Sequence, residues 1–429
     1  MKLHVRELIR YIIGPDLRLR HAGWLSLGAA IVLSLLSVYA IDVAMIATPP
    51  EGALPVHLSG HSAKQLVFLG VGLFAAMMIA LPHYRVIRAL AWPLMWVMVG
   101  FLIFLLVPFV PSWIVTPRNG ARAWINFGIT DFQPAEIAKI AFVLVVADYL
   151  RYRQNHRTLL GLIPPGLIAA IPIGLIMLQP DLGTAMLFVP ALFAMLVAAG
   201  ARIQHLAAVV LIAILAAPVA YPLLKPHQKA RIVGMINMMG DPTKGADDIN
   251  YQSLTAQTLA GAGKLVGVPD ARARVLVRYN RLPERHNDMI LAVLMTRFGM
   301  LGALGLLFLY AVWFAGAYLS AALCKDAFAR LVIVGCCAIM GAQIFINMAM
   351  TLGILPIIGI TLPFVSYGGS SMLTVWIMTG LVLNVAMRPQ VRLARPAFEF
   401  DAQPYDRLGQ STPQRIAPMS RASGRRRAG

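Results

Sequence analysis

The chain has 429 residues, 59% of them hydrophobic and only 13% charged, and its formal net charge is +19. Soluble domains carry about 25% charged residues, so this composition excludes an ordinary water-soluble protein and indicates side chains that face lipid. A basic chain can also bind nucleic acid, but the basic residues here lie between apolar runs and near the termini, which favours a membrane surface and no nucleic acid.

Apolar runs recur along the chain and predict an all-α, polytopic membrane helical bundle of about ten transmembrane helices, because each crossing needs about 20 mostly apolar residues. The predicted spans are residues 24–46, 64–82, 89–111, 135–150, 160–178, 184–200, 204–222, 289–322, 331–352 and 371–387. The first run is longer than the apolar part of a signal peptide and lacks its cleavage site, so we interpret it as a span. The run 289–322 is too long for one straight crossing, and we expect it to tilt or to begin as a short surface segment.

The basic residues divide unequally between the two sides that these spans define. The short loops of one side carry only Lys64, Arg118 and Arg122, whereas most other basic residues outside 225–288 fall on the opposite side. Because cytoplasmic loops carry the excess of Lys and Arg, both termini are predicted to be cytoplasmic. The predicted organisation is a cytoplasmic N-terminal segment (1–23), a transmembrane domain (24–387) with one long extracytoplasmic loop (225–288), and a disordered basic cytoplasmic tail (388–429).

Four polar clusters interrupt the apolar background, and all four map to the predicted outer face. The first contains Arg122 and Trp124, followed by Glu136 and Lys139, which lie three apart at a helix start and can pair on one face. An interfacial salt bridge with a tryptophan anchor fits the same spacing. The second cluster, residues 179–184, contains Asp181, which taken alone is the cap of the following helix.

The third cluster belongs to the long loop. It includes Gln252 and Ser253 and ends in the run from Arg285 through His286 to Asp288. Burial, or the two neighbouring bases, could shift the pKa of Asp288, and a helix-capping aspartate is the alternative interpretation.

The fourth cluster, residues 362–371, contains Ser366, then two glycines, then Ser370. Such a turn at a helix start can hold a phosphate through N–H and hydroxyl groups, although a plain turn with a serine cap fits as well. Together the four clusters indicate a site for an anionic lipid-linked substrate, or the vestibule of a transporter.

These clusters, in this order, resemble the RodA/FtsW family, the shape, elongation, division and sporulation (SEDS) group of peptidoglycan glycosyltransferases. The resemblance runs from about Trp24 to Arg388. It is carried by Gly120-Ala121-Arg122 with Trp124, Gln133-Pro134 with Glu136 and Lys139, residues 179–184, Gln252-Ser253, Pro283-Glu284-Arg285-His286 with Asp288, and residues 362–371. Residues 282–286 and 355–360 look slightly more like RodA, which favours elongation over division.

The resemblance implies a glycan polymerase that joins lipid II at the outer face of the bacterial cytoplasmic (inner) membrane, for cell elongation or division. It implies a class B penicillin-binding protein transpeptidase as the protein partner, with lipid II as substrate, and no nucleic acid. A divalent cation, Mg²⁺ or Mn²⁺, is the expected cofactor, with no organic cofactor, and the resemblance assigns no metal ligands.

The same resemblance makes Asp288 the catalytic residue, and chemistry supports a general base there because the acceptor hydroxyl must lose a proton. Arg122 and Lys139 are candidates for holding the pyrophosphate, and Glu136 and Asp181 for holding a cation or placing Lys139. The predicted substrate-binding residues are Arg122, Trp124, Glu136, Lys139, Asp181, Gln252, Ser253, Arg285, His286, Ser366 and Ser370.

The sequence departs from the family pattern close to the supposed site. Thr296-Arg297 stand where two acidic residues are usual, Asn287 replaces a threonine, and residues 258–263 replace a glycine/serine-rich stretch. These departures favour, as an alternative, a non-catalytic scaffold for a class B penicillin-binding protein. A lipid II flippase is a further alternative; it should carry polar residues at mid-span, for which Arg297 and Gln343 are the main candidates.

Overall fold

The computed structural model describes residues 21–46, 60–117, 120–128, 130–153, 155–223 and 251–388, together with the isolated positions Lys229 and Val233. The N-terminal segment up to residue 20, Arg118, most of residues 225–250 and the predicted tail beyond Arg388 lie outside the described residues. The predictions made for those parts therefore stay predictions.

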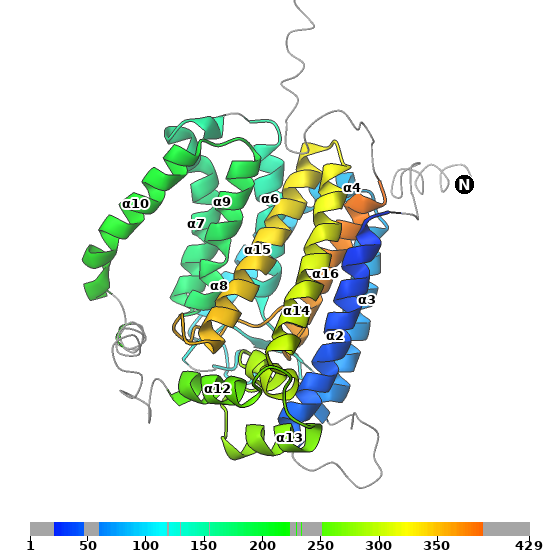
Figure 1. Ribbon diagram of the computed structural model, residues 1–429. Helices are drawn as coiled ribbons and strands as arrows, with labels where there is room; N and C mark the ends of the chain where they lie inside the picture. Colours follow the sequence, from blue (N-terminus) through cyan, green and yellow to red (C-terminus); the bar gives the residue numbers. More distant parts are fainter. Residues whose placement is uncertain are drawn as a thin grey trace, which may run out of the picture. The chain divides into compact units, whose positions relative to one another are not determined.

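Helices predominate in the described chain, and most of the long ones run roughly along one common direction as a bundle (Figure 1). They are α2 (Gly23–Met45), α3 (Gly60–Ala80), α4 (Tyr84–Ala89), α5 (Ala91–Leu106), α6 (Pro134–Leu150), α7 (Ile163–Leu178), α8 (Leu182–Met186), α9 (Phe188–Ala198), α10 (Ile203–Ala220), α12 (Tyr251–Ala262), α13 (Asp270–Tyr279), α14 (Ile290–Ala322), α15 (Ala327–Thr351) and α16 (Gly369–Ala386). One short antiparallel pair joins β1 (Ile125–Asn126) to β2 (Asp131–Phe132). Single 3-10 turns cover Asn155–Arg157, Leu160–Leu162 and Tyr221–Leu223.

Every predicted span coincides with helix, with α8 and α9 together forming one of them. Among the described residues, 6 helices are long and apolar enough to cross a membrane, and Ala91–Leu106, Leu182–Ala198 and Ile203–Ala216 are shorter apolar helices. The remaining predicted span, α6, is apolar between its terminal charges. The prediction of an all-α, polytopic membrane protein is confirmed.

The long predicted run 289–322 is a helix with a break. Gly299 in α14 has φ 67° and ψ −161°, a conformation outside the helical range that suits glycine. The carbonyls of Lys264 and Leu265 accept hydrogen bonds from the N–H groups of Met300 (2.9 Å) and Leu301 (3.0 Å), which the break deprives of helical partners. The expectation that this run cannot continue straight is correct. The helix breaks where the segment containing Lys264 and Leu265 packs against it and takes over its hydrogen bonds.

The described part of the predicted long loop is more ordered than its polarity suggests. Residues 251–288 contain α12 and α13, which the sequence interpretation left without regular structure. Figure 1 shows α13 lying across the end of α2. The helix was missed because Arg274, which looks like a solvated loop charge, is buried against Asp42 of α2 at 2.9 Å.

The bundle has two chemically different ends. Residues 286–288, α12 and α13 lie at one, here called the Asp288 end, and α4 with Arg85 and Arg88 lies at the other, here called the arginine end (Figure 1). The start of α2 reaches the arginine end, where a Cβ on Gly23 would be 2.9 Å from the Cβ of Ala386 at the end of α16. The start of α2 and the end of α16 thus lie on the same side of the bundle, as an even number of membrane crossings requires.

The close approach of α3 to α16 generates a test of the packing. A Cβ on Gly72 would lie 2.6 Å from Cδ1 of the fully buried Trp376, whereas a Cβ on Gly70 meets nothing within 4 Å. We expect Gly72→Val to destabilise the fold by about 1–3 kcal/mol through overpacking. Gly70→Val is the matched control on the same helix. Melting temperatures of the purified proteins in detergent measure the difference, and equal values would contradict this packing.

Candidate functional site

Asp288 follows directly on a segment that Ser366 and Tyr367 fix in place. The hydroxyl of Ser366 donates to the carbonyl of Asn287 (2.6 Å), and the N–H of Tyr367 donates to the carbonyl of His286 (2.9 Å). Gln65 of α3 in turn donates to the carbonyl of Ser366 (3.1 Å). The predicted phosphate-binding hydroxyl of Ser366 is therefore occupied in holding the segment that leads to Asp288.

Asn347 of α15 holds Asp288 from the other side. Its side-chain N–H₂ donates to the carbonyls of Asp288 (2.7 Å) and Ile360 (2.7 Å), and Asn347 is fully buried. Oδ2 of Asp288 lies 3.9 Å from the position that a Cβ on Gly359 would take, so glycine leaves space beside the carboxylate. Asp288 itself is 6% exposed, and the N-cap position of α14 falls on Met289, so Asp288 is not the N-cap of that helix.

The first and second clusters supply an ion pair and a neighbouring carboxyl. Nζ of Lys139 lies 2.9 Å from Oε1 of Glu136, and both residues are buried in the first turns of α6. Asp181 caps α8 by accepting from the N–H (3.0 Å) and hydroxyl (2.8 Å) of Thr184. Burial raises the pKa of Asp181, the charge of Glu136 adds to that rise, and the Thr184 hydrogen bonds and the charge of Lys139 oppose it. Both local predictions, the pair and the cap, are confirmed.

Two links bring these clusters to the same region of the Asp288 end. Gln133 donates its side-chain N–H₂ to Asp181 (3.1 Å) and its backbone N–H to Ser370 (3.0 Å). Gly183 packs on the chain before the Ser366 turn, since a Cβ there would lie 3.0 Å from the carbonyl of Ile358. Residues 358–370 therefore join the surroundings of Asp288 to those of Asp181. Ser370 donates to the carbonyl of Asp131 (3.1 Å), so its hydroxyl also serves this joining.

An aromatic triangle lies beside the segment before Asp288. The rings of His61 and His286 have centroids 5.5 Å apart, and Tyr367 lies 5.3 Å from the first and 5.6 Å from the second. Burial lowers the pKa of His286, the charge of Glu284 opposes this, and His61 and Arg285 add to it. His286 is therefore mainly neutral at neutral pH and can accept a proton or a hydrogen bond.

The other predicted residues are placed less centrally. Arg122 donates to the carbonyl of Val110 (3.3 Å), a contact that leads to the segment after α5 and not to Asp288 or Lys139. Gln252 and Ser253 lie in the first turn of α12, where Ser253 is buried and accepts from Gln257. Trp124 and Arg285 are half-buried. Burial and the nearby Arg278 lower the pKa of Arg285.

The donors available to a divalent cation are few. The described residues contain no group of three or more His, Cys, Asp or Glu side chains that could enclose a metal ion. Mg²⁺ is often held by one or two carboxylates plus substrate phosphates. Glu136 fits that mode, because its Oε2 is buried without a hydrogen-bond partner in the described part of the chain. The donor set thus fits an ion that arrives with a phosphorylated substrate.

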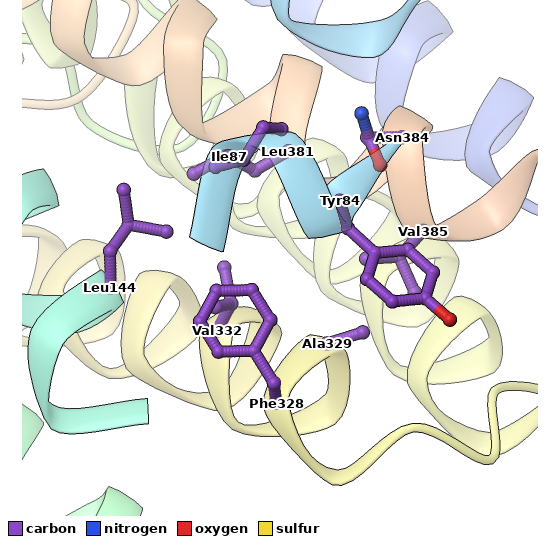
Figure 2. A pocket seen from close by; sticks show the side chains of 9 residues that line it. All are labelled: Tyr84, Ile87, Leu144, Phe328, Ala329, Val332, Leu381, Asn384 and Val385. Carbon is purple, nitrogen blue, oxygen red and sulfur yellow. The ribbon is translucent and has the colours of Figure 1, made fainter. Parts of the chain in front are cut away.

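A small pocket lies elsewhere, at the arginine end (Figure 2). It lies between α4, α6, α15 and α16, and its lining is apolar apart from Tyr84 and Asn384. Of the described residues predicted for the site, none lines it. Its position and lining make it a packing gap between helices and exclude it as the polar site.

Comparison with known proteins identifies the family. The model of the cell cycle protein family FtsW/RodA/SpoVE matches residues 24–390. The chain belongs to this family. Stage V sporulation protein E of Bacillus subtilis is 34% identical over 325 residues, 75% of this chain and 86% of that protein. A probable peptidoglycan glycosyltransferase FtsW of Thiomicrospira cyclica is 31% identical over 393 residues, 88% of this chain and 96% of the relative.

Solved structures of the FtsW/RodA/SpoVE family have the same fold. RodA of Thermus thermophilus superimposes with a TM-score of 0.60 at 25% identity, covering 86% of this chain and 98% of that one. A chain from a peptidoglycan synthase complex, described as coordinating polymerization and crosslinking, gives 0.69 at 28% identity, covering 85% and 97%. The predicted family and enzyme class, a peptidoglycan glycosyltransferase, are confirmed. The preference for RodA over FtsW stays a prediction.

Three residues that the sequence interpretation passed over contribute to this family site. They are Gln65, Asn347 and His61. Asn347 carried a usable signal, because a polar side chain inside an apolar span is costly unless it has a partner and is often functional. Gln65 and His61 stand near the start of a span, where polar residues are ordinary, so only the fold reveals their contacts.

The Asn347 contacts generate a prediction for this FtsW/RodA/SpoVE member. Asn347→Leu removes both donors, and because each unsatisfied buried carbonyl costs about 1–3 kcal/mol, we expect glycan synthesis from lipid II to fall about tenfold or more. Thr351→Val, one turn later on α15, removes a hydroxyl whose partner among the described residues is the carbonyl of Asn347 (3.0 Å), and it should keep near-normal activity. Equal activities of the two purified variants would show that the Asn347 contacts do not position the site.

Proposed function

We propose that this protein polymerises lipid II into glycan strands at the outer face of the cytoplasmic membrane, with Asp288 as the general base. The observation that carries the proposal is that Asp288, which is nearly buried, is fixed in place. Asn347 holds its backbone carbonyl, and Ser366 and Tyr367 hold the segment before it. The place of Asp288 at the same end of the bundle as the Glu136–Lys139 pair supports the proposal. A base with a fixed position and little water around it suits proton abstraction from a sugar hydroxyl.

The reaction requires few groups from the protein. Asp288 takes the proton of the acceptor hydroxyl as that oxygen attacks the anomeric carbon, a role that typically contributes ~10²–10⁴-fold. The bond to the pyrophosphate breaks, and direct attack inverts the anomeric centre. His286, held near Tyr367 and mainly neutral, is placed to orient the acceptor or to take up the proton later.

The leaving pyrophosphate needs positive charge. Lys139 is fully buried and paired, so its charge acts through the low-dielectric interior and not by direct contact with substrate. A divalent cation that arrives with the pyrophosphate would neutralise its charge, and the buried carboxylate of Glu136 would attract that ion through the same interior. Arg122, half-buried and with Nε unbonded in the described residues, remains the candidate for direct phosphate contact.

The charges and the relatives support a setting for the enzyme. The arginine end faces the cytoplasm by the positive-inside rule, so Asp288 faces outward and both termini are cytoplasmic, in the inner membrane of a bacterium. A class B penicillin-binding protein supplies the crosslinking step. The likeness to a chain of a complex that coordinates polymerization and crosslinking supports such a partner.

The flippase alternative loses its main support. Arg297 is bonded to Tyr39 and to the carbonyl of Val268 near the Asp288 end, so it marks no polar path through the bilayer. Gln343 is buried to 1% exposure within α15. Asn347, one turn later, is buried as well, and two side chains on one helix do not make a translocation path for a charged headgroup.

The base assignment is tested by Asp288→Ala in full-length protein supplied with lipid II and divalent cation. We expect no polymer, at least ~10²-fold below wild type, with an unchanged melting temperature. Asp148→Asn, a partly exposed carboxylate of α6 near Arg88 at the arginine end, is the control and should retain activity. Glycan product from the Asp288→Ala protein would rule out the base. An inactive wild type that still binds a penicillin-binding protein would favour the scaffold.

The buried ion pair allows folding to be separated from function. Lys139→Met strands the charge of Glu136, which costs about 3–5 kcal/mol, whereas replacing both partners is often nearly neutral. The double variant Glu136→Gln/Lys139→Met should therefore melt close to wild type and yet polymerise poorly. Normal polymerisation by the double variant would assign the pair to stability alone.

A further inference from the structure

A network of charged and phenolic side chains attaches α13 to the bundle. Arg274 is 1% exposed, and its Nη2 donates to Asp42 of α2 (2.9 Å) while its Nη1 donates to the carbonyls of Asp42 (3.1 Å) and Ile46 (3.3 Å). Its Nε donates to Asp270 at the start of α13 (2.6 Å). One arginine thus satisfies the end of α2 and connects it to α13.

Asp270 extends this network to α14. The hydroxyl of Tyr39 donates to Asp270 (2.6 Å) and accepts from Nε of Arg297 (2.8 Å), which itself lies 3.6 Å from Asp270. Arg297 also donates to the carbonyl of Val268 (3.2 Å). Burial alone would raise the pKa of Asp270, but the hydrogen bonds of Tyr39 and Arg274 and the charges of Arg274 and Arg297 lower it overall. Asp270 is therefore ionised at neutral pH, where the network is complete.

Arg297 lies next to the break in α14. It lies two residues before the break at Gly299, where the carbonyls of Lys264 and Leu265 accept from the N–H groups of Met300 and Leu301. The preceding Thr296 is fully buried and donates to the carbonyl of Leu259 in α12 (2.9 Å). The first part of α14, residues 290–298 before the break, therefore depends on α2, α12 and α13 for its orientation, and only Met289 separates it from Asp288.

We propose that Arg297 and Tyr39 are positioning residues that clamp residues 290–298 and thereby hold the Asp288 carboxylate where it reacts. This inference rests on the proposed function. Seven residues of helix separate Ile290 from Arg297, roughly 10 Å at 1.5 Å per residue, so Arg297 acts through the helix and not by contact with Asp288. Arg297 thereby sets its positive charge against the negative charge of Asp270 at the start of α13.

The test uses full-length protein in lipid nanodiscs. Arg297→Met removes the charge and donors, Arg297→Lys keeps the charge, and Tyr39→Phe removes only the bridging hydroxyl; Arg278→Met is the control, an exposed arginine of α13 outside the network. We expect Arg297→Met to lower kcat for lipid II polymerisation about tenfold with KM nearly unchanged, since small misplacements can have large effects on rate. Arg297→Lys should recover part of kcat, and the Tyr39→Phe and Arg297→Met effects should be non-additive.

Hydrogen exchange gives a readout that does not depend on catalysis. In Arg297→Met the amides of Met300 and Leu301, and those of residues 264–268, should exchange about fivefold faster or more, with the melting temperature and the Arg278→Met protein unchanged. Unchanged kcat, or a kcat loss that only follows the unfolded fraction, overturns the clamp. If wild type makes no polymer, the proposed function fails, and the exchange rates alone then decide: faster exchange supports the clamp and unchanged exchange overturns it.

Discussion

The two hydrogen bonds that Asn347 donates, to the carbonyls of Asp288 and Ile360, are the contacts on which the candidate site depends. Backbone carbonyls outside helices need a donor, and an apolar bundle offers no water to supply one. One amide group on the rigid helix α15 satisfies two such carbonyls from segments far apart in sequence. It thereby allows non-helical backbone at the Asp288 end of the bundle, and it fixes the position of Asp288 within that backbone.

The same constraint accounts for the charged residues at that end. Glu136 and Lys139 are buried as a pair within one helix, and Asp42 and Arg274 as a pair between two elements. An unpaired charge buried in these places would strongly destabilise the fold, so neither member of a pair could be buried there without the other. A region of fixed charges with little water is also one in which electrostatic effects on a reacting phosphate are large. The burial that requires these charges to be paired therefore also strengthens their proposed effect on the substrate.

Local signals predicted much of this structure. The spans follow from hydropathy, the Glu136–Lys139 pair from a spacing of three, and the Asp181 cap from its place before a helix. Long-range contacts were beyond such signals. Arg274 looks like a loop charge until α2 presents Asp42, and α13 was missed with it. Arg122 matches a family motif, yet its hydrogen bond goes to Val110, because the fold of the segment after α5 decides its partner.

The break at Gly299 shows how an exposed segment becomes part of the transmembrane structure. The carbonyls of Lys264 and Leu265 accept the hydrogen bonds that α14 loses there, and a Cβ on Gly299 would lie 2.4 Å from the backbone N of Gly267, so neither segment can shift without the other. The part of α14 after the break packs along α2, whereas the part before it leads to Asp288. Since residues 264 and 265 complete the hydrogen bonding of the helix, their docking and the position of the carboxylate form one structural unit. A site at the rim of a bundle can in this way be held as firmly as one in a core.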